Sequence, residues 1–177
     1  MIRITGGTNR SRLLATPNTE LTKPTMDKVR AAVFSALGDA VKNANVLDLF
    51  AGSGSYGFEA LSRGAASAVF VDKSRDAYSS IKENAKNLGY ENIEIIFGDS
   101  LAFLSENTHK FSIIFVDPPY KLDVYEKVVE TLIKGNMLEE NGIIVLESER
   151  ELNLDNSMFK SVRFYKYGLA KIYIIRN

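Results

Sequence analysis

Four consecutive residues, Asp117-Pro118-Pro119-Tyr120, combine an acid, two prolines and an aromatic ring directly after the apolar run 111–116. The run is short and rich in Ile, Phe and Val, which predicts a buried strand that ends at the acid. Two prolines in succession stiffen the following loop, because each ring fixes its φ angle. This arrangement suits a site that holds a planar, conjugated amino group while a methyl group is placed on its nitrogen.

The exocyclic amine of a nucleobase is a poor nucleophile because its lone pair is delocalised into the ring. Two acceptors aimed at its hydrogens, the Asp117 carboxylate and the Pro118 carbonyl, would turn the lone pair toward the methyl donor. Tyr120 can stack on the face of the base, an interaction worth about 1–3 kcal/mol. Transfer from a sulfonium is an in-line displacement, so positioning supplies much of the catalysis. We therefore predict that the catalytic residues are Asp117, Pro118, Pro119 and Tyr120.

A second candidate site follows the apolar run 46–50. Gly52, Gly54 and Gly57 form a G-x-G-x-x-G pattern between a predicted strand and a predicted helix. Glycine lets the backbone come close to a ligand and adopt the positive φ angles that a tight turn needs. The same pattern serves nicotinamide dinucleotides, so these glycines alone do not choose between that cofactor and S-adenosylmethionine.

Acidic residues stand near the ends of the next two predicted strands. Asp72 follows Gly52 by 20 residues, which is the place of an acid that hydrogen-bonds a ribose diol. Asp99 follows the run 92–97 and can accept from an adenine amino group, whereas Asp48 has a second interpretation as a buried hydrogen-bonding acid. The residues predicted to hold the cofactor, S-adenosylmethionine, are Asp48, Phe50, Ala51, Gly52, Ser53, Gly54, Asp72, Lys73, Asp99 and Ser100.

Short apolar runs alternate with helix-length amphipathic stretches after residue 44, which predicts βαβ units and a parallel sheet covered on both faces. The predicted strands are 45–50, 68–72, 92–97, 111–116 and 142–147. The predicted helices lie near 55–63, 74–88, 100–107 and 123–135.

The pattern changes at the end of the chain. The stretches 159–167 and 170–175, joined by a tight turn at Gly168, predict an antiparallel hairpin with no helix between its strands. A parallel sheet that ends in such a hairpin is typical of the Rossmann-like class I methyltransferases that use S-adenosylmethionine. We therefore expect an α/β fold with a seven-stranded sheet and helices on both faces.

The first 44 residues differ from the rest. Residues 2–5 and 12–16 predict a small hairpin, and a helix is expected from about Thr25, its N-cap, to Leu37. We expect residues 1–177 to form a single domain, in which residues 1–44 are an N-terminal extension that contributes to RNA binding.

One face of that predicted helix is apolar. Val29, Val33 and Leu37 are four residues apart and form a single stripe. Lys28 and Arg30 are expected to point away from it.

The composition excludes several classes of site. The chain has 177 residues, no cysteine and one histidine, His109, which lies in the polar stretch 106–110 and is expected on the surface. Disulfides and thiolate metal sites are excluded, and no metal site is predicted. No run approaches the roughly 18 consecutive apolar residues of a membrane span, and residues 1–7 lack the apolar core of a signal peptide. We expect a cytoplasmic monomer with no membrane partner.

The net charge is zero, but the charges are unevenly distributed. Residues 1–30 carry six bases and two acids, a net +4, and residues 158–177 carry five bases and no acid, a net +5. This separation predicts one basic face that attracts a polyanion.

The sequence resembles a known family in five segments, which are Gly6-Gly7 with Arg10 and Arg12, the stretch 23–30, the stretch 48–54, the stretch 117–120, and Glu147-Ser148-Glu149. These are similar to the RsmD family of bacterial small-subunit ribosomal RNA guanine-N2 methyltransferases, over nearly the whole chain. The stretch 23–30 makes the resemblance specific, because many amino methyltransferases share the glycine loop and D-P-P-Y. This chain has Lys23 where arginine is usual, which keeps the charge and loses the bidentate fork, and Ala31 where glutamate is common.

The resemblance implies methyl transfer from S-adenosylmethionine to the N2 amine of a guanine in 16S rRNA, either naked or within an assembling or assembled 30S subunit. It also implies that residues around the mouth of the active site hold RNA phosphates. These residues are Arg10, Arg12, Lys23, Thr25, Lys28 and Arg30. Glu147 keeps two interpretations, a structural role or a place in the pocket wall.

Other functions remain open from the residues themselves. D-P-P-Y also serves DNA adenine-N6, DNA cytosine-N4 and protein glutamine methyltransferases, although 177 residues leave no room for the separate target-recognition domain of a DNA enzyme. An RNA-assembly factor that binds the cofactor without turnover is a candidate from a different class. Nicotinamide redox chemistry is disfavoured, because no obvious proton donor for hydride transfer accompanies the glycine loop.

Overall fold

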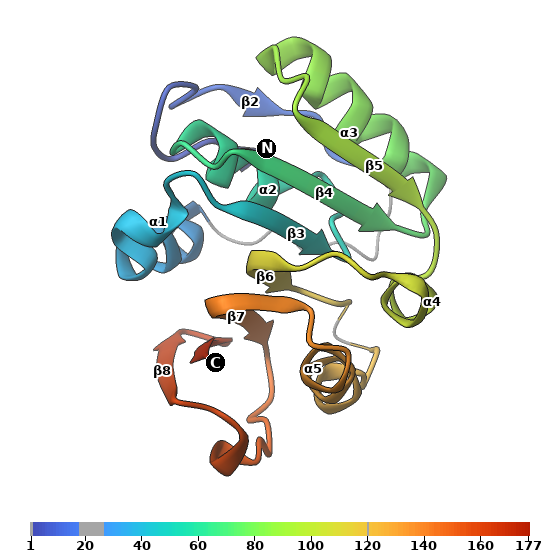
Figure 1. Ribbon diagram of the computed structural model, residues 1–177. Helices are drawn as coiled ribbons and strands as arrows, with labels where there is room; N and C mark the ends of the chain where they lie inside the picture. The colour runs from blue at the N-terminus through green and yellow to red at the C-terminus, as the bar shows by residue number, and fades with distance from the viewer. Residues whose placement is uncertain (1, 18–26, 120) are drawn as a thin grey trace.

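A seven-stranded mixed sheet with helices on both faces organises the chain (Figure 1). The structure is a computed structural model that describes residues 2–17, 27–119 and 121–177. The sheet has the order β5-β4-β3-β6-β7-β9-β8. Its strands are β3 (Asn45–Leu49), β4 (Ser67–Asp72), β5 (Ile93–Phe97), β6 (Phe111–Val116), β7 (Leu138–Ser148), β8 (Ser161–Tyr167) and β9 (Ala170–Arg176).

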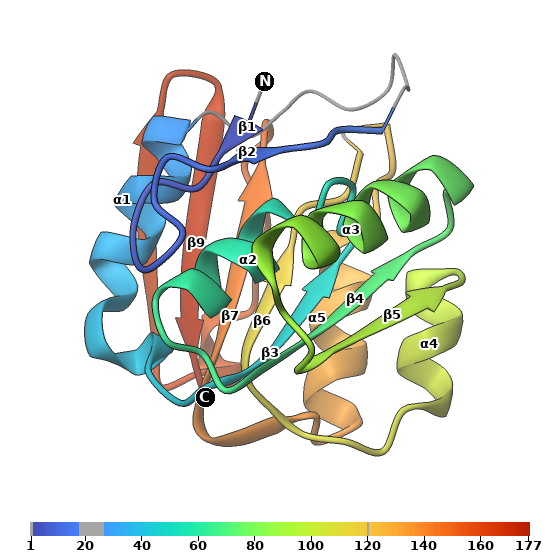
Figure 2. The same ribbon diagram turned by 90° about the horizontal axis from the view of Figure 1, so that it is seen from above.

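The helices divide between the two faces of the sheet (Figure 2). They are α1 (Asp27–Leu37), α2 (Ser55–Ser62), α3 (Arg75–Leu88), α4 (Ser100–Glu106) and α5 (Tyr125–Lys134), with short 3₁₀ turns η1 (Gly38–Val41) and η2 (Asn156–Met158). Helices α1, α2 and α3 share one buried cluster with the sheet, whereas α4 and α5 share a second cluster on the opposite face. Among the described helices, none combines the length and apolar character that a bilayer span requires.

The central strands are apolar throughout because both of their faces are covered. In β6, Ile113 and Phe115 belong to the cluster under α1, α2 and α3, whereas Ile114 and Val116 belong to the cluster under α4 and α5. All four side chains are at most 1% exposed. Alternate residues therefore point to fixed faces of the sheet, which determines where the residues after each strand project.

The predicted fold class is confirmed. Strands β3 to β7 pair in parallel, β9 pairs antiparallel with β7 and β8, and Gly168 turns between β8 and β9 with a φ of +62°. The predicted start of β7 at residue 142 is wrong, because the strand begins at Leu138. Leu138 pairs with Phe111, and Ile143 pairs with Ile113, so the register shifts between these two pairs. The bulge interrupts the apolar pattern of the strand, and the pattern therefore does not indicate the start at Leu138.

The chain order of the sheet reverses between β3 and β6. Strand β3 continues through β4 to β5 on one side, whereas β6 lies against its other side. Ligands of open α/β sheets bind outside the carboxyl ends of the strands at such a switch point. Figure 2 shows these carboxyl ends along one edge, with β1 (Ile2–Arg3) and β2 (Leu13–Leu14) beside them.

The predicted N-terminal hairpin forms, with Ile2 opposite Leu14 and Arg3 opposite Leu13. Its loop is tied to the end of α2, where the Thr8 N–H donates to the Ser62 carbonyl at 2.8 Å. Gly7 has a φ of +78°, and a Cβ there would lie 1.7 Å from the Ser62 carbonyl oxygen. Only glycine allows this close approach.

Candidate active site

The loop that follows β6 begins with the predicted catalytic residues Asp117, Pro118 and Pro119. Asp117 is half-buried and Pro118 is buried. The Leu122 N–H donates to the Pro119 carbonyl at 2.7 Å, which closes a turn and occupies that oxygen. Within the described ranges, no group donates to the Pro118 carbonyl. Tyr120 lies outside the described residues.

The loop after β3 is shaped by positive φ angles at Phe50 (59°), Gly52 (56°) and Gly54 (75°). The Ala51 N–H donates to the Val71 carbonyl at 3.0 Å, and the Gly54 N–H donates to the Ala51 carbonyl at 2.7 Å. A Cβ added at Gly52 would meet no atom within 4 Å. The loop is therefore open to a ligand at Gly52, and two backbone hydrogen bonds hold it in place.

Asp48 supports the loop from within the protein. Its side chain is 2% exposed, and its Oδ2 accepts the Gly57 N–H at 2.9 Å. Burial raises the pKa of Asp48 to about 8, the Gly57 hydrogen bond opposes this shift, and the negative charge of Asp72 adds to it. The structure thus gives Asp48 the contacts of a buried hydrogen-bonding acid beside the start of α2.

The two other predicted acids lie at neighbouring strand ends. Asp72 Oδ2 accepts the Gly52 N–H at 2.8 Å, and its Oδ1 accepts the Ser74 N–H at 2.8 Å. Asp99 is exposed and caps α4 by accepting the Leu101 N–H at 2.9 Å. The remaining residues of the predicted cofactor set fall on the same edge, with Lys73 exposed, Ser53 buried and Ser100 buried.

The chemistry of these residues fits S-adenosylmethionine. Carboxylates at the end of β4 and at the start of α4 match a ribose diol and an adenine amine, both of which are hydrogen-bond donors. The open side of Gly52 leaves room for the backbone to approach the ligand. In residues 2–17, 27–119 and 121–177, no cluster of three or more His, Cys, Asp or Glu residues is arranged to hold a metal ion.

A second carboxylate, Glu147, lies beside Asp117. Val116 pairs with Leu146, so Asp117 and Glu147 follow side by side at the ends of β6 and β7. Glu147 is 2% exposed, and the Tyr56 hydroxyl donates to its Oε2 at 2.7 Å. Glu147 is therefore a buried, hydrogen-bonded acid next to the loop that follows β6.

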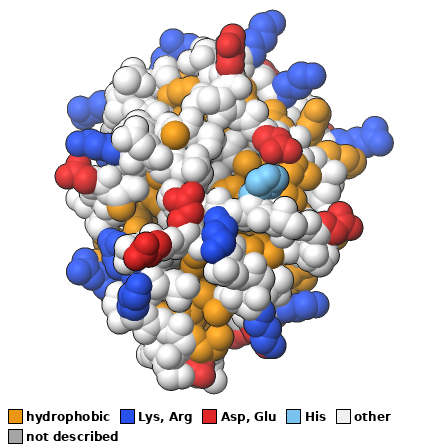
Figure 3. All heavy atoms as spheres, in the orientation of Figure 1, with side chains coloured by type: hydrophobic (Ala, Val, Ile, Leu, Met, Phe, Trp, Pro, Cys, Tyr) orange, Lys and Arg blue, Asp and Glu red, His pale blue; other side chains and the backbone are white. Residues whose placement is uncertain are grey.

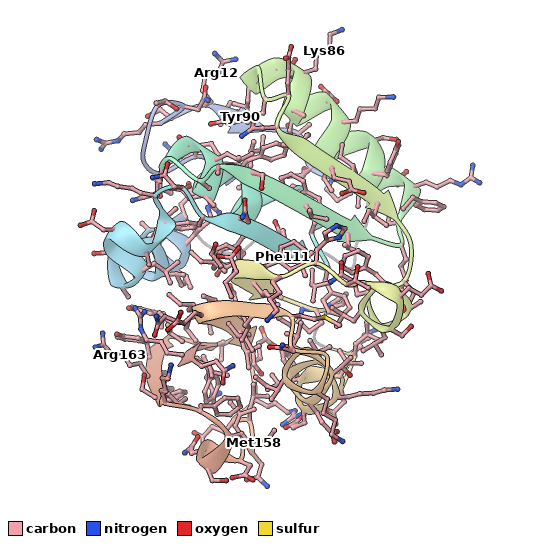
Figure 4. All side chains as sticks on the ribbon, viewed as in Figure 1. Arg12, Lys86, Tyr90, Phe111, Met158 and Arg163 are labelled. Carbon is pink, nitrogen blue, oxygen red and sulfur yellow. The ribbon has the colours of Figure 1, made fainter. Side chains whose placement is uncertain are left out.

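The predicted RNA-binding residues are partly described. Arg10, Arg12 and Lys28 are exposed, whereas Lys23 and Thr25 lie outside the described residues. Arg12 donates to the Asn87 carbonyl at 2.8 Å. Figure 4 accordingly shows Arg12 on the side of the molecule that carries Tyr90 and Lys86.

The prediction that Arg30 contacts RNA phosphates is wrong for this structure, because its side chain is 0% exposed. The guanidinium pairs with Asp27 at 3.0 Å and with Glu59 at 3.3 Å, and it also donates to the Arg3 carbonyl. A charge paired this way inside the protein is not available to a phosphate. Arg30 instead holds α1 against α2.

Labelled basic residues from the two ends of the chain lie toward opposite edges of the seven-stranded sheet. Arg12 lies beside α3, whereas Arg163 lies on β8, the edge strand farthest from β5 (Figure 4). On the face drawn in Figure 3, which carries His109, basic and acidic side chains are interspersed. The expectation of one basic face stays a prediction.

Three further buried side chains were not predicted from the sequence. Glu59 and Tyr125 are buried, and Tyr56 stacks on Phe115 with ring centroids 4.7 Å apart. A signal existed for Glu59, since a single acid interrupts the apolar run from Phe58 to Leu61. No local pattern marks the two tyrosines, because aromatic residues near a helix start are ordinary core residues.

A hollow of about 470 Å³ opens at the other end of the sheet, where His109 lies (Figure 3). Its apolar walls include Val69, Ile96 and Phe103, and its rim carries Glu94, Glu106 and Lys110. His109 is exposed, as predicted. Its lining comes from the amino ends of the strands, so this hollow is separate from the candidate active site.

Comparison with known proteins supports the fold and the family. The family model described as Conserved hypothetical protein 95 matches residues 2–176. The chain is 35% identical over 153 residues to ribosomal RNA small subunit methyltransferase D of Escherichia coli K12, covering 86% of this chain and 77% of that protein. A solved structure of a hypothetical protein from Thermus thermophilus has a TM-score of 0.85 at 28% identity, covering all of both chains.

A more distant solved structure is the 16S rRNA N2 G1207 methyltransferase RsmC of Thermus thermophilus, in complex with AdoMet and guanosine. It has a TM-score of 0.73 at 22% identity, over 90% of this chain and 44% of that chain, and it shows a shared class I methyltransferase fold. The family match spans nearly the whole chain and agrees with the named relative. The chain therefore belongs to the family described as Conserved hypothetical protein 95, the RsmD family that its sequence resembles.

Proposed function

We propose that this protein is an S-adenosylmethionine-dependent methyltransferase that methylates the N2 amine of a guanine in 16S rRNA. One observation carries the proposal. Leu49 pairs with Val116, so the glycine loop that follows β3 and Asp117-Pro118-Pro119 that follow β6 start side by side. The switch point of the sheet thus brings together the two loops to which the proposal assigns the cofactor and the amine.

The cofactor would lie along the open side of Gly52, with Asp72 and Asp99 as hydrogen-bond acceptors. When bound, S-adenosylmethionine supplies an electrophilic methyl group on a sulfonium. The protein contributes a fixed loop, because Asp72 accepts the Gly52 N–H within the loop and Asp48 accepts the Gly57 N–H in the first turns of α2. Such a preformed site lowers the entropy cost of bringing the two reactants together.

The amine would lie between the Asp117 carboxylate and the Pro118 carbonyl. The Pro119 carbonyl is already bonded to Leu122, which leaves the Pro118 carbonyl as the backbone acceptor of this turn. Two acceptors on the amine hydrogens direct the nitrogen lone pair away from the ring and toward the methyl donor. A base in a structured RNA would have to leave its stack, at a cost of about a few kcal/mol.

The relatives support the choice of substrate. The Escherichia coli relative is named a small-subunit ribosomal RNA methyltransferase, and the structure of RsmC contains AdoMet and guanosine. We further propose that residues 1–44 contact RNA phosphates through Arg10, Arg12 and Lys28, which are exposed. On this proposal the protein acts in the cytoplasm as a monomer.

The test is methyl transfer from radiolabelled S-adenosylmethionine to small ribosomal subunits and to naked 16S rRNA, both from cells that lack this protein. The RNA is digested to nucleosides and separated. Label in N2-methylguanosine is the expected result, and the substrate that accepts it identifies the recognition unit. Cofactor binding by calorimetry with no label in either RNA would overturn the proposal and favour an assembly factor without turnover.

A further inference from the structure

Two acids lie side by side where β6 ends. Val116, the last residue of β6, pairs with Leu146, and Asp117 and Glu147 are the next residues along each chain segment. Both charges act on the same two hydroxyl groups, those of Tyr56 and Tyr125, so the two acids share one polar environment. Neighbouring strands are about 4.8 Å apart, which is the separation expected between the two backbones.

Glu147 is held by Tyr56. The Tyr56 hydroxyl donates to Glu147 Oε2 at 2.7 Å, and the tyrosine ring is fixed by stacking on Phe115 at 4.7 Å. Burial, together with the negative charges of Glu147 and Asp117, raises the pKa of Tyr56 well above its usual range. Tyr56 therefore stays a hydrogen-bond donor to Glu147.

The methylated edge of guanine differs from that of the other amino bases. Next to its exocyclic amine, guanine carries a ring N1–H donor, whereas adenine and cytosine carry a ring nitrogen acceptor. Asp117 and the Pro118 carbonyl account for the two hydrogens of the amine. They leave without a partner the N1–H donor, which adenine and cytosine lack beside their amines.

We propose that Glu147 accepts the N1–H of the target guanine and thereby makes the site specific for guanine. Opposite adenine or cytosine, the carboxylate would face the lone pair of a ring nitrogen. A site built to accept a substrate N–H rejects an analogue that lacks it by about 10⁴-fold in favourable cases, because a buried polar group is left unpaired. This inference rests on the proposed function and assigns its base specificity to one residue.

Analogues at the methylated position test the proposal. Small subunits are reconstituted with 16S rRNA that carries guanine, 2-aminopurine or 6-thioguanine at the position labelled by the wild-type enzyme. All three bases have the amine, but only 2-aminopurine has an acceptor at N1. The wild-type protein is expected to methylate guanine and 6-thioguanine at rates within about fivefold, and 2-aminopurine at least about a hundredfold more slowly.

The variant Glu147→Gln makes the test specific to this residue. The amide oxygen of the new glutamine can still accept a hydrogen bond from the Tyr56 hydroxyl. In that orientation the amide N–H groups point toward the base. In this variant, kcat/KM for the guanine substrate should fall at least about tenfold. The ratio of kcat/KM for guanine to kcat/KM for 2-aminopurine should also fall at least about tenfold. Glu139→Gln is the matched control, because Glu139 lies at the opposite end of β7 and bonds Asn45 and Ser112.

Cofactor affinity and melting temperature are measured for both variants, so that misfolding is separated from lost recognition. A folded Glu147→Gln protein with the wild-type preference for guanine overturns the proposal. If that variant does not fold, the proposal is tested by the rates of the wild-type protein alone. Equal rates of methylation of guanine and 2-aminopurine would then overturn the proposal. The absence of N2-methylguanosine from wild-type reactions would instead overturn the proposed function itself.

Discussion

Arg30 and Glu59 form an ion pair, with 3.3 Å between Nε and Oε2, in which both side chains are wholly buried. Glu59 also accepts the backbone N–H and the hydroxyl of Thr5, each at 2.7 Å, and the Arg63 Nε at 2.7 Å. One carboxylate therefore joins the N-terminal hairpin, α1 and α2. Because α2 begins at the glycine loop, this pair links the proposed RNA-binding extension to the proposed cofactor site.

Substitution Glu59→Gln should lower the free energy of unfolding by about 3–5 kcal/mol, because it leaves the buried Arg30 charge without its buried counterion. Urea denaturation followed by circular dichroism measures the loss. Glu130→Gln is the control, since Glu130 pairs with Lys134 on the surface of α5 and should change stability by less than about 1 kcal/mol. Equal losses in the two variants would contradict a structural role for Glu59.

Lys28 and Arg30 both lie in α1, but only Lys28 is expected to contribute to RNA binding. Lys28→Ala should reduce the slope of log affinity against log salt by about 0.7–0.9, the value for one phosphate contact. Arg30→Lys should leave this slope unchanged while it lowers stability, because Arg30 is buried. Fluorescence anisotropy with a 16S rRNA fragment at several KCl concentrations measures both slopes. A reduced slope in a folded Arg30→Lys protein would restore Arg30 to the RNA-binding surface.

Asp48 should make stability depend on pH. Burial raises its pKa in the folded protein from 3.8 to about 8, so between about pH 4 and pH 8 the folded state holds a proton that the unfolded state has lost. The contribution of this group to stability therefore falls as pH rises through that window. Urea unfolding of the wild type and Asp48→Asn at pH 5 and pH 8 measures it. The variant should lose less stability over this interval, and parallel pH profiles would show that Asp48 is ionised in the folded protein.

The hydroxyl of Tyr125 is buried and makes no hydrogen bond of normal geometry among the described residues. Burial, with the charges of Asp117 and Glu147, raises the pKa of Tyr125 to about 12, and the nearby Ser148 side chain opposes this shift. Tyr125→Phe should therefore stabilise the free protein by about 1 kcal/mol, because it removes an unpaired buried donor. Tyr56→Phe should have the opposite effect, since it breaks the bond to Glu147. Thermal unfolding of both variants checks the signs, and destabilisation by Tyr125→Phe would make Ser148 a partner of its hydroxyl.

Asp117→Ala should lower kcat by about 10²–10⁴-fold while cofactor affinity changes less than about twofold. The physical reason is that Asp117 is proposed to contact the amine, whereas the cofactor is held from β3 and β4. Single-turnover methyl transfer and calorimetry separate the two effects. Asp123→Ala is the control, because Asp123 is exposed and pairs with Arg150. Near-normal turnover in Asp117→Ala would remove Asp117 from the catalytic site.

The fold could be predicted from the sequence because its signals are local. Apolar runs such as 111–116 and the glycines of residues 52–57 mark strand ends and the turns that follow them. These marks place the proposed cofactor loop and Asp117 at one edge of the sheet, whichever strand order is adopted. The early start of β7 at Leu138 is not local, because it depends on pairing with Phe111.

Side-chain partners are the part that the sequence does not show. Arg30 follows Val29 in an amphipathic helix and has the pattern of a surface residue, yet its buried partner Glu59 lies 29 positions away in another helix. The bond between Tyr56 and Glu147 spans 91 positions and depends on how α2 packs over β7. Such pairs form only when the chain is folded, so composition and spacing do not reveal them.

The N-terminal hairpin is fastened to the core by its backbone as well as by its side chains. Thr5, Thr8 and Asn9 donate backbone N–H groups to Glu59 and Ser62, and Ala15 does the same to Asn84. The hairpin is thus not a detachable module. An exchange of hairpins between relatives, intended to transfer RNA specificity, has to carry the matching α2 and α3 residues with it. If the chain is shortened to begin after β2, a loss of RNA binding would reflect lost folding rather than lost recognition.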